Sequence, residues 1–203
     1  MFFDAFPLDS APDEPEPEEH AAPEWLRSPE DELPALALGP RILGRSDRAS
    51  LAVGAIEVFS TGIAVPVEAV VRRLGESRRD WQQLMDAVFR HHGPGPLRFG
   101  VELADGSSAV TTSGIPGWRV ALGGGDGAPA GPLLTMDDRG GGGGGRLIEM
   151  HPRLWLWPFP PAGAIRLYAE WPAVGIAETS AELDGAALAA ARPSVGSRWA
   201  DPA

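Results

Sequence analysis

The chain has 203 residues, a net charge of −11 and 43% hydrophobic residues, which is enough apolar side chain for one folded domain. It contains no Cys, and this excludes disulfides, cysteine-ligated zinc and thiol catalysis. All 17 basic residues are Arg, so Schiff-base lysines and the phosphate-binding lysine of a P-loop are excluded as well.

The negative charge is concentrated at the start of the chain. Residues 1–32 hold 11 acids and one Arg, a net charge of −10, whereas residues 33–203 hold 17 acids and 16 Arg, a net charge of −1. Because like charges repel and prolines restrict the chain, we predict that residues 1–38 form a disordered, acidic, Pro-rich tail.

Two apolar clusters interrupt this acidic tail. Acidic segments with such clusters can fold onto a partner, although a purely solubilising tail is the simpler interpretation. The candidate docking residues are Phe2, Phe3, Phe6, Trp25 and Leu26. The start of the chain shows neither the cationic region of a secretory signal nor a long apolar run, so we expect a cytoplasmic location and no membrane partner.

The folded part begins with two predicted strands, residues 51–59 and 63–73, the second of which alternates apolar and polar side chains. Pro66 lacks an N–H group, so the second strand is expected at a sheet edge or at a bulge. Residues 78–92 have apolar side chains at helical spacing after a capping Ser77, and they predict an amphipathic helix.

A hairpin is predicted for residues 97–103 and 107–112, because Asp105-Gly106 is a strong tight-turn signal. Residues 118–122 predict a short strand. Residues 123–145 are expected to form a loop, since the run of six glycines at its end loses much backbone entropy on ordering.

Two further strands are expected at residues 146–157 and 164–171, joined by a proline-rich connector, and residues 174–176 are expected to continue the second. Asp184 can cap a short Ala-rich helix that ends at Ala191. The pattern predicts a mainly β fold, an antiparallel β-sandwich or open barrel with one amphipathic helix. Its predicted range is residues 39–192, followed by a flexible C-terminus at 193–203.

The motifs that suggest chemistry are weak. The glycine run contains a formal dinucleotide-binding spacing, but no strand precedes it and Pro152 interrupts the segment after it, so no cofactor is expected. A metal site is conceivable only if the chain gathers its scattered oxygen and nitrogen ligands, namely Asp137, Asp138, Glu149 and His151. We therefore assign no catalytic, cofactor-binding or metal-binding residue.

The most distinctive feature is a group of aromatic residues on two strands that we expect to be adjacent. Such a group forms either part of the core or an exposed platform for a partner protein. Its aromatic members are Trp155, Trp157, Tyr168 and Trp171, and Glu170 belongs to the same candidate surface.

The glycine run, the Trp155-Leu156-Trp157-Pro158 segment and the Glu170-Trp171-Pro172 segment together resemble a β-rich family of uncharacterised actinobacterial proteins. This resemblance implies a high-GC bacterial source and no particular activity.

The sequence thus favours a non-catalytic cytoplasmic protein that acts as an interaction or scaffold domain with a protein partner. A nucleic-acid partner is disfavoured because the tail repels phosphate and the rest of the chain has no basic excess. The alternative is a carboxylate-based hydrolase, which could be metal-assisted.

Overall fold

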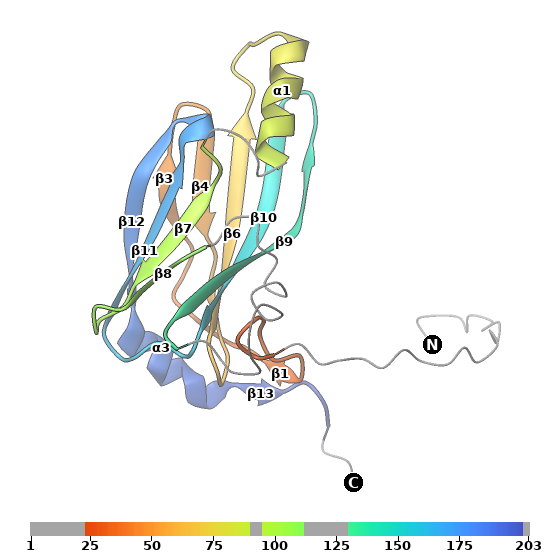
Figure 1. Ribbon diagram of the computed structural model, residues 1–203. Helices are drawn as coiled ribbons and strands as arrows, with labels where there is room; N and C mark the ends of the chain where they lie inside the picture. Colours follow the sequence, from red (N-terminus) through yellow and green to blue (C-terminus); the bar gives the residue numbers. More distant parts are fainter. Residues whose placement is uncertain (1–22, 90–94, 112–129, 201–203) are drawn as a thin grey trace, which may run out of the picture.

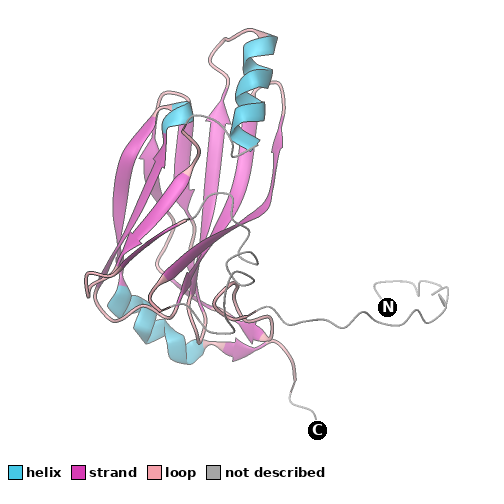
Figure 2. Ribbon diagram, viewed as in Figure 1, coloured by secondary structure: helices cyan, strands magenta, loops and turns pink. Residues whose placement is uncertain are grey.

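The computed structural model describes residues 23–89, 95–111 and 130–200 (Figure 1). Within these ranges the chain forms two large antiparallel sheets and one two-stranded pair, with one helix beside the extended end of the larger sheet and another at the opposite end (Figure 2). The sheets do not close into a barrel in the described part of the chain. The predicted mainly β, antiparallel fold is therefore confirmed.

Seven of the described strands form the larger sheet. They are β2 (Ala35–Ala37), β3 (Arg41–Arg45), β4 (Ala49–Val53), β5 (Ile56–Val58), β6 (Ile63–Arg72), β9 (Leu133–Gly143) and β10 (Leu147–Trp157). The main path runs β2-β5-β6-β10-β9, and β4 joins β6 to β3. The central strand β6 therefore has neighbours on both sides.

The smaller sheet runs in the order β12-β11-β7-β8. Its strands are β7 (Arg98–Glu102), β8 (Ser108–Val110), β11 (Ala164–Trp171) and β12 (Ile176–Asp184). A two-stranded pair, β1 (Glu32–Leu33) with β13 (Gly196–Ser197), closes one end of the molecule. The helices are α1 (Arg78–Phe89) and α3 (Gly185–Ala191), with short 3-10 turns at Pro172–Val174 and Arg192–Ser194.

The core lies between the inward faces of the two sheets. Alternation of side chains along each strand places one apolar face inward, as the sequence predicts. The buried side chains on the inward face of β6 are Ile63, Val65, Val67, Ala69 and Val71, and on β11 they are Ile165, Leu167, Ala169 and Trp171. The alternating apolar positions of both strands are therefore the positions that face the core.

The predicted amphipathic helix is α1, and it begins after Ser77. The Ser77 hydroxyl accepts a hydrogen bond from the amide of Asp80 and donates one to its carboxylate, as expected of a helix N-cap. Trp81 and Val88 are buried against the core. The helix therefore covers the part of the larger sheet that extends beyond the smaller one (Figure 1).

The first four glycines of the run belong to a strand, so the predicted loop at 123–145 is wrong over residues 133–143. Strand β9 continues through Gly143 and pairs with β10. A Cβ atom at Gly143 would lie 2.4 Å from the Cε atom of Met85 on α1. The indole Nε1 of Trp81 donates to the carbonyl of Gly144 at 2.7 Å. Packing against α1 therefore outweighs the loss of backbone entropy that led us to predict a loop for these glycines.

Pro66 does not mark an edge, because β6 has neighbours on both sides, but the other predicted possibility, an irregularity in the strand pairing, is found opposite this residue. The predicted strand 51–59 divides into β4 and β5, which pair with different parts of β6. Pro66 falls between these two pairings, where its carbonyl accepts a hydrogen bond from the amide of Gly54 at 2.8 Å. The missing N–H group therefore costs no ladder hydrogen bond to β4 or β5.

The chain does not continue β11 through residues 174–176. It turns through a 3-10 segment and Gly175, whose φ of 79° lies in the left-handed region, and returns as β12. Strand β12 is not predicted from the sequence, because its polar, half-exposed side chains show weak apolar alternation. The helix capped by Asp184 is confirmed as α3, and the hairpin turn at Asp105-Gly106 is confirmed as well.

Both predicted boundaries of the domain need correction. Strands β1 and β2 lie within the predicted tail 1–38, and β13 lies within the predicted flexible end 193–203. The amide of Arg198 donates to the carbonyl of Asp31 at 2.7 Å, so the two ends hold each other. Composition does not reveal such pairing. The disorder predicted for residues 1–22 and the strand predicted at 118–122 concern residues outside the described ranges.

Candidate binding groove

A groove of about 990 Å³ lies on the outer face of the larger sheet, under residues 24–34, which we call the strap. The strap contributes Arg27, Ser28, Pro29, Glu30 and Pro34 to its lining. The sheet contributes Ala52, Gly54, Glu57, Phe59, Pro66, Glu68, Asp137, Arg139, His151, Pro152 and Arg153. The groove therefore crosses five strands, from β4 to β9.

The strap is held mainly through its backbone carbonyls. The indole Nε1 of Trp155 donates to the carbonyl of Glu24 at 3.1 Å, and the hydroxyl of Thr135 donates to that of Leu26 at 3.2 Å. Farther along, the carboxylate of Glu32 accepts a hydrogen bond from the amide of Ser60 at 2.8 Å. Trp25 and Leu26 are half-buried in this strap, so these two predicted docking residues already belong to the fold. Phe2, Phe3 and Phe6 lie outside the described residues.

Arg153 occupies the floor of the groove. Its guanidinium group binds the carboxylate of Glu57, with Nε 3.0 Å from Oε2, and its Nη1 lies 3.0 Å from the hydroxyl of Ser28. The Arg153 side chain is only 11% exposed, and it also lies over the ring of Phe59 at 5.6 Å. This contact set joins the strap to the sheet through a partly desolvated ion pair, which is stronger than an exposed one.

A small apolar cluster on the outer face lies next to this ion pair. The rings of Phe59 and Trp155 meet edge to face with centroids 5.6 Å apart, and Trp155 is 2% exposed. Gly62 lies against the same indole, where a Cβ atom would come within 2.7 Å of the Trp155 ring. Through Trp155, this cluster holds the start of the strap, at Glu24, against the sheet.

The charges that line the groove balance. Four acids (Glu30, Glu57, Glu68 and Asp137) face four arginines (Arg27, Arg139, Arg153 and Arg198). Two pairs neutralise each other, Arg153 with Glu57 and Arg27 with Glu30. The lining thus offers hydrogen-bonding groups of both signs beside prolines and small apolar side chains.

The candidate metal ligands do not come together. Asp137 and His151 line the groove, but Glu149 does not, and the carboxylate of Asp138 accepts the amide of Gly140 at 2.9 Å. Across the described ranges, no three His, Asp or Glu side chains are close enough to hold a metal ion. The geometry gives the metal-assisted hydrolase no support.

Of the two interpretations of the aromatic group, part of the core or an exposed platform, the platform does not form, because β10 and β11 belong to different sheets. The proline-rich connector carries the chain from one sheet to the other instead of closing a hairpin. Trp171 is 1% exposed and lies in the core, while Trp155 and the half-buried Trp157 belong to the outer-face cluster. Sequence spacing cannot distinguish a hairpin from a crossover between sheets.

Tyr168 and Glu170 lie on the outer face of the smaller sheet, within a second depression of about 700 Å³. The Tyr168 hydroxyl donates to the carboxylate of Glu102 at 2.9 Å, and Glu170 binds Arg98. A Cβ atom at Gly100 would lie 3.8 Å from that of Tyr168, so the tyrosine side chain stands beside this glycine. The Tyr168 hydroxyl and the Glu170 carboxylate therefore both have partners on the neighbouring strand β7.

Sequence reasoning missed the central pair of the groove. Glu57 and Arg153 are charged residues within otherwise apolar strands, and each has buried neighbours on both sides. That pattern places both on the face opposite the core. The pairing itself depends on β5, β6 and β10 being neighbours, which the sequence does not reveal.

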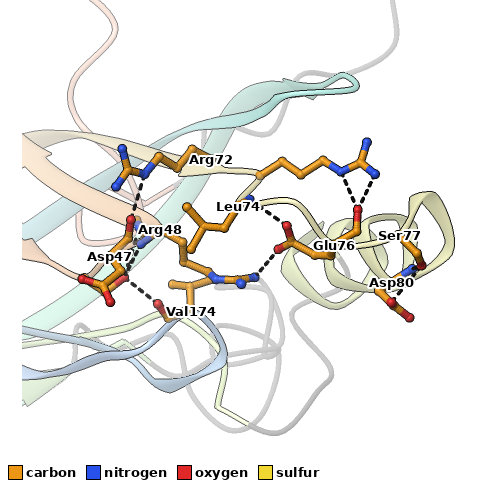
Figure 3. A network of polar contacts seen from close by, with 11 residues as sticks. Asp47, Arg48, Arg72, Leu74, Glu76, Ser77, Asp80 and Val174 are labelled. Carbon is orange, nitrogen blue, oxygen red and sulfur yellow. Dashed lines mark hydrogen bonds and ion pairs between the residues drawn. The ribbon is translucent and has the colours of Figure 1, made fainter.

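A polar network at the opposite end of the larger sheet joins the turn between β3 and β4, the end of β6 and the start of α1 (Figure 3). Arg48 pairs with Glu76 at 2.8 Å, and the amide of Leu74 donates to the same carboxylate at 2.6 Å. Hydrogen bonds from the backbone amides of Glu76 itself and of Leu74, together with the charge of Arg48, hold the pKa of Glu76 below its ordinary value.

This network predicts a specific pH dependence. Because the pKa of Glu76 is lower in the folded state, its stabilising contribution is present above the ordinary glutamate pKa and is lost as pH falls through the folded value. We expect the thermal midpoint of Glu76→Gln to fall less between pH 7 and acid pH than that of the native chain. Glu149→Gln, at an exposed position on β10, is the control and should follow the native curve.

Comparisons with protein-family models, with curated proteins and with solved structures find no match to this chain. The resemblance to an actinobacterial family thus stays an expectation. Among the described helices, none is long and apolar enough to span a bilayer.

Proposed function

We propose that this chain is a non-catalytic, cytoplasmic protein-interaction domain that binds an extended segment of a partner protein in the groove beneath the strap. The observation that carries the proposal is the form of the groove. It is open, it crosses five strands, and its lining combines prolines and small apolar side chains with charges of both signs. Extended peptides bind such surfaces through apolar contacts and a polar rim.

The balance of charge in the groove favours a protein over a nucleic acid. A phosphate-binding surface needs an excess of Arg or Lys, since most of its affinity comes from neutralising phosphates. Here the four arginines face four acids, and the most buried guanidinium, that of Arg153, is already bound by Glu57. The hydrolase alternative lacks a comparable observation in its favour.

Filling the groove tests the proposal. Ala52 is half-exposed on β4 and lines the groove, so Ala52→Trp should block it without disturbing the core. Val110→Trp is the matched control, because Val110 is 67% exposed on the smaller sheet, away from the groove. Both variants should retain the circular dichroism spectrum and unfolding midpoint of the native chain.

The full chain and both variants are used to capture partners from lysate of the source organism. We expect one protein to bind the native chain and Val110→Trp, and its affinity for Ala52→Trp, measured calorimetrically with purified components, to be at least about tenfold weaker, or about 1.4 kcal/mol. Equal affinity for all three chains would contradict the proposal.

A further inference from the structure

We propose that the partner segment lies across the strands of the larger sheet in a polyproline II conformation and sets a basic side chain against Glu68. An apolar side chain three residues away in the segment, in either direction, lies over Ala52 and Ile42. This specificity deepens the proposed function and rests on it, because it states the chemistry of the segment that the groove binds.

A single row of outward-facing residues crosses the groove from one side of the sheet to the other. Ile42 on β3 lies across from Ala52 on β4, and Ala52 lies across from Glu68 on β6. The pairing of β6 with β10 continues the row to His151, and Arg139 lies beside it at the bulge of β9. The row therefore follows five neighbouring strands at right angles to their direction (Figure 1).

Glu68, in the middle of the row, has an exposed side chain that makes no hydrogen bond or ion pair with a described residue. Its outward neighbours along β6 are Pro66 and Val70, which are both half-buried. The nearest guanidinium on β10, that of Arg153 across from Pro66, is already bound by Glu57. The carboxylate of Glu68 is therefore open to a cation from a partner.

The other charges that line the groove are compensated or lie away from this position. At the β9 end, Asp137 lies across from Arg153 and two residues from Arg139, so this end carries both signs. In the strap, one arginine and one glutamate neutralise each other. The guanidinium of Arg198 is turned to the strap's backbone carbonyls, at 3.1 and 3.2 Å. The middle of the row is thus negative, and a basic side chain complements it.

The end of the row on β3 and β4 is apolar. Ile42 is 44% exposed, Ala52 is half-buried, and Pro40, just before β3, lines the groove. Covering these side chains with an apolar group removes apolar area from water, which is favourable. The partner is therefore expected to place an apolar side chain at this end.

The spacing of the strands selects the conformation of the partner segment. Neighbouring strands lie about 4.8 Å apart, so Ile42 and Glu68, on strands separated by β4, are about 10 Å apart. In a polyproline II helix every third side chain points the same way, and the repeat is about 9.3 Å. In a β-strand the repeat is about 6.8 Å, which matches neither one strand spacing nor two. An apolar and a basic side chain three residues apart fit the row.

The backbone of the sheet is not available to a segment that lies in this direction. β6 and β10 are each paired with neighbours on both sides. A polyproline II helix makes no internal hydrogen bonds and keeps its backbone solvated, so it needs no ladder with the sheet. Recognition then depends on the side chains of the row, and the charge of residue 68 determines which segments bind.

Peptide titrations of the full chain test this specificity. The probes are blocked peptides: PPLPPRPP, its glutamate counterpart PPLPPEPP, and PPLPRPPP, in which the spacing is shortened to two residues. Amide shifts of Ala52 and Glu68 in the ¹⁵N chain give the affinities. We expect PPLPPRPP to bind at least about threefold more tightly than either of the others, which is the size of an exposed ion pair.

Charge reversal at residue 68 provides the decisive comparison. In Glu68→Arg the preference should reverse, so that PPLPPEPP binds more tightly than PPLPPRPP. Glu178→Arg makes the same charge change at an exposed position on β12 of the smaller sheet and should keep the native preference. Absence of groove shifts with PPLPPRPP, or a preference that Glu68→Arg leaves unchanged, would overturn the inference.

The Ala52→Trp variant and the captured protein separate this inference from the proposed function. If Ala52→Trp weakens binding of the captured protein while the peptides show no dependence on residue 68, then the groove binds a partner and the specificity stated here is wrong. If Ala52→Trp leaves binding of the captured protein unchanged, then the proposed function fails and this specificity fails with it.

Discussion

Replacing Trp171 with alanine should lower the free energy of unfolding by about 3–5 kcal/mol. Trp171 is 1% exposed and lies in the core between the sheets, so its removal leaves a large cavity that the surrounding strands fill only partly. Urea denaturation followed by circular dichroism measures the effect.

Trp199→Ala is the matched control for this substitution. Trp199 is 67% exposed beyond β13, and its replacement should change the free energy of unfolding by no more than about 0.5 kcal/mol. Similar losses for the two variants would contradict the assignment of Trp171 to the core. They would restore the interpretation of this tryptophan as part of an exposed platform.

Deleting residues 1–31 should lower the free energy of unfolding by about 3–4 kcal/mol, because each hydrogen bond lost contributes about 1 kcal/mol. Deleting residues 1–22 should change it by less than about 1 kcal/mol. The longer deletion removes hydrogen bonds that Trp155, Thr135 and Arg153 make to the strap. It also removes the Asp31 carbonyl that binds the amide of Arg198.

Comparison of the two deletions locates the true boundary of the domain. Thermal and urea unfolding of both truncated chains are measured at the same protein concentration. If the 1–31 deletion is as stable as the 1–22 deletion, then residues 24–31 of the strap do not contribute to the stability of the fold, in agreement with the tail predicted from composition for residues 1–38.

The strand faces could be predicted because alternation is a local property. On β6 and β11 each apolar position of the sequence pattern is a buried side chain in the structure. The helix cap at Ser77 and the turn at Asp105-Gly106 could be predicted for the same reason, since neighbouring residues supply all the necessary groups.

Which strands pair with each other could not be predicted, and the wrong predictions of the loop and of the aromatic platform follow from this. Gly143 is typical of a loop until α1 is placed against it, and Trp155 is the expected neighbour of Trp171 until the connector is seen to cross between sheets. The Arg153–Glu57 pair joins residues 96 positions apart, and no local pattern encodes it. In each of these cases tertiary contacts, and not the local propensity of the sequence, determine the structure.

The strap explains why the composition of the first 38 residues misleads. Its prolines and acids are typical of a solvated tail, yet its contacts use backbone carbonyls, which every sequence has. One carboxylate, that of Glu32, is held by the amide of Ser60 at the chain reversal between β5 and β6. A low apolar content is therefore compatible with an ordered segment when an existing sheet supplies the donors.

The central claim, that the outer face of the larger sheet receives the partner, is tested most directly by methyl NMR of the full chain titrated with the captured protein. The methyl groups of Ala52 and of Ile42, which is 44% exposed on β3, report on this face, and those of Val110 report on the smaller sheet. We predict shifts or broadening of the Ala52 and Ile42 signals while the Val110 signals stay unchanged. Changes confined to Val110 would contradict the claim and move the interface to the opposite side of the sandwich.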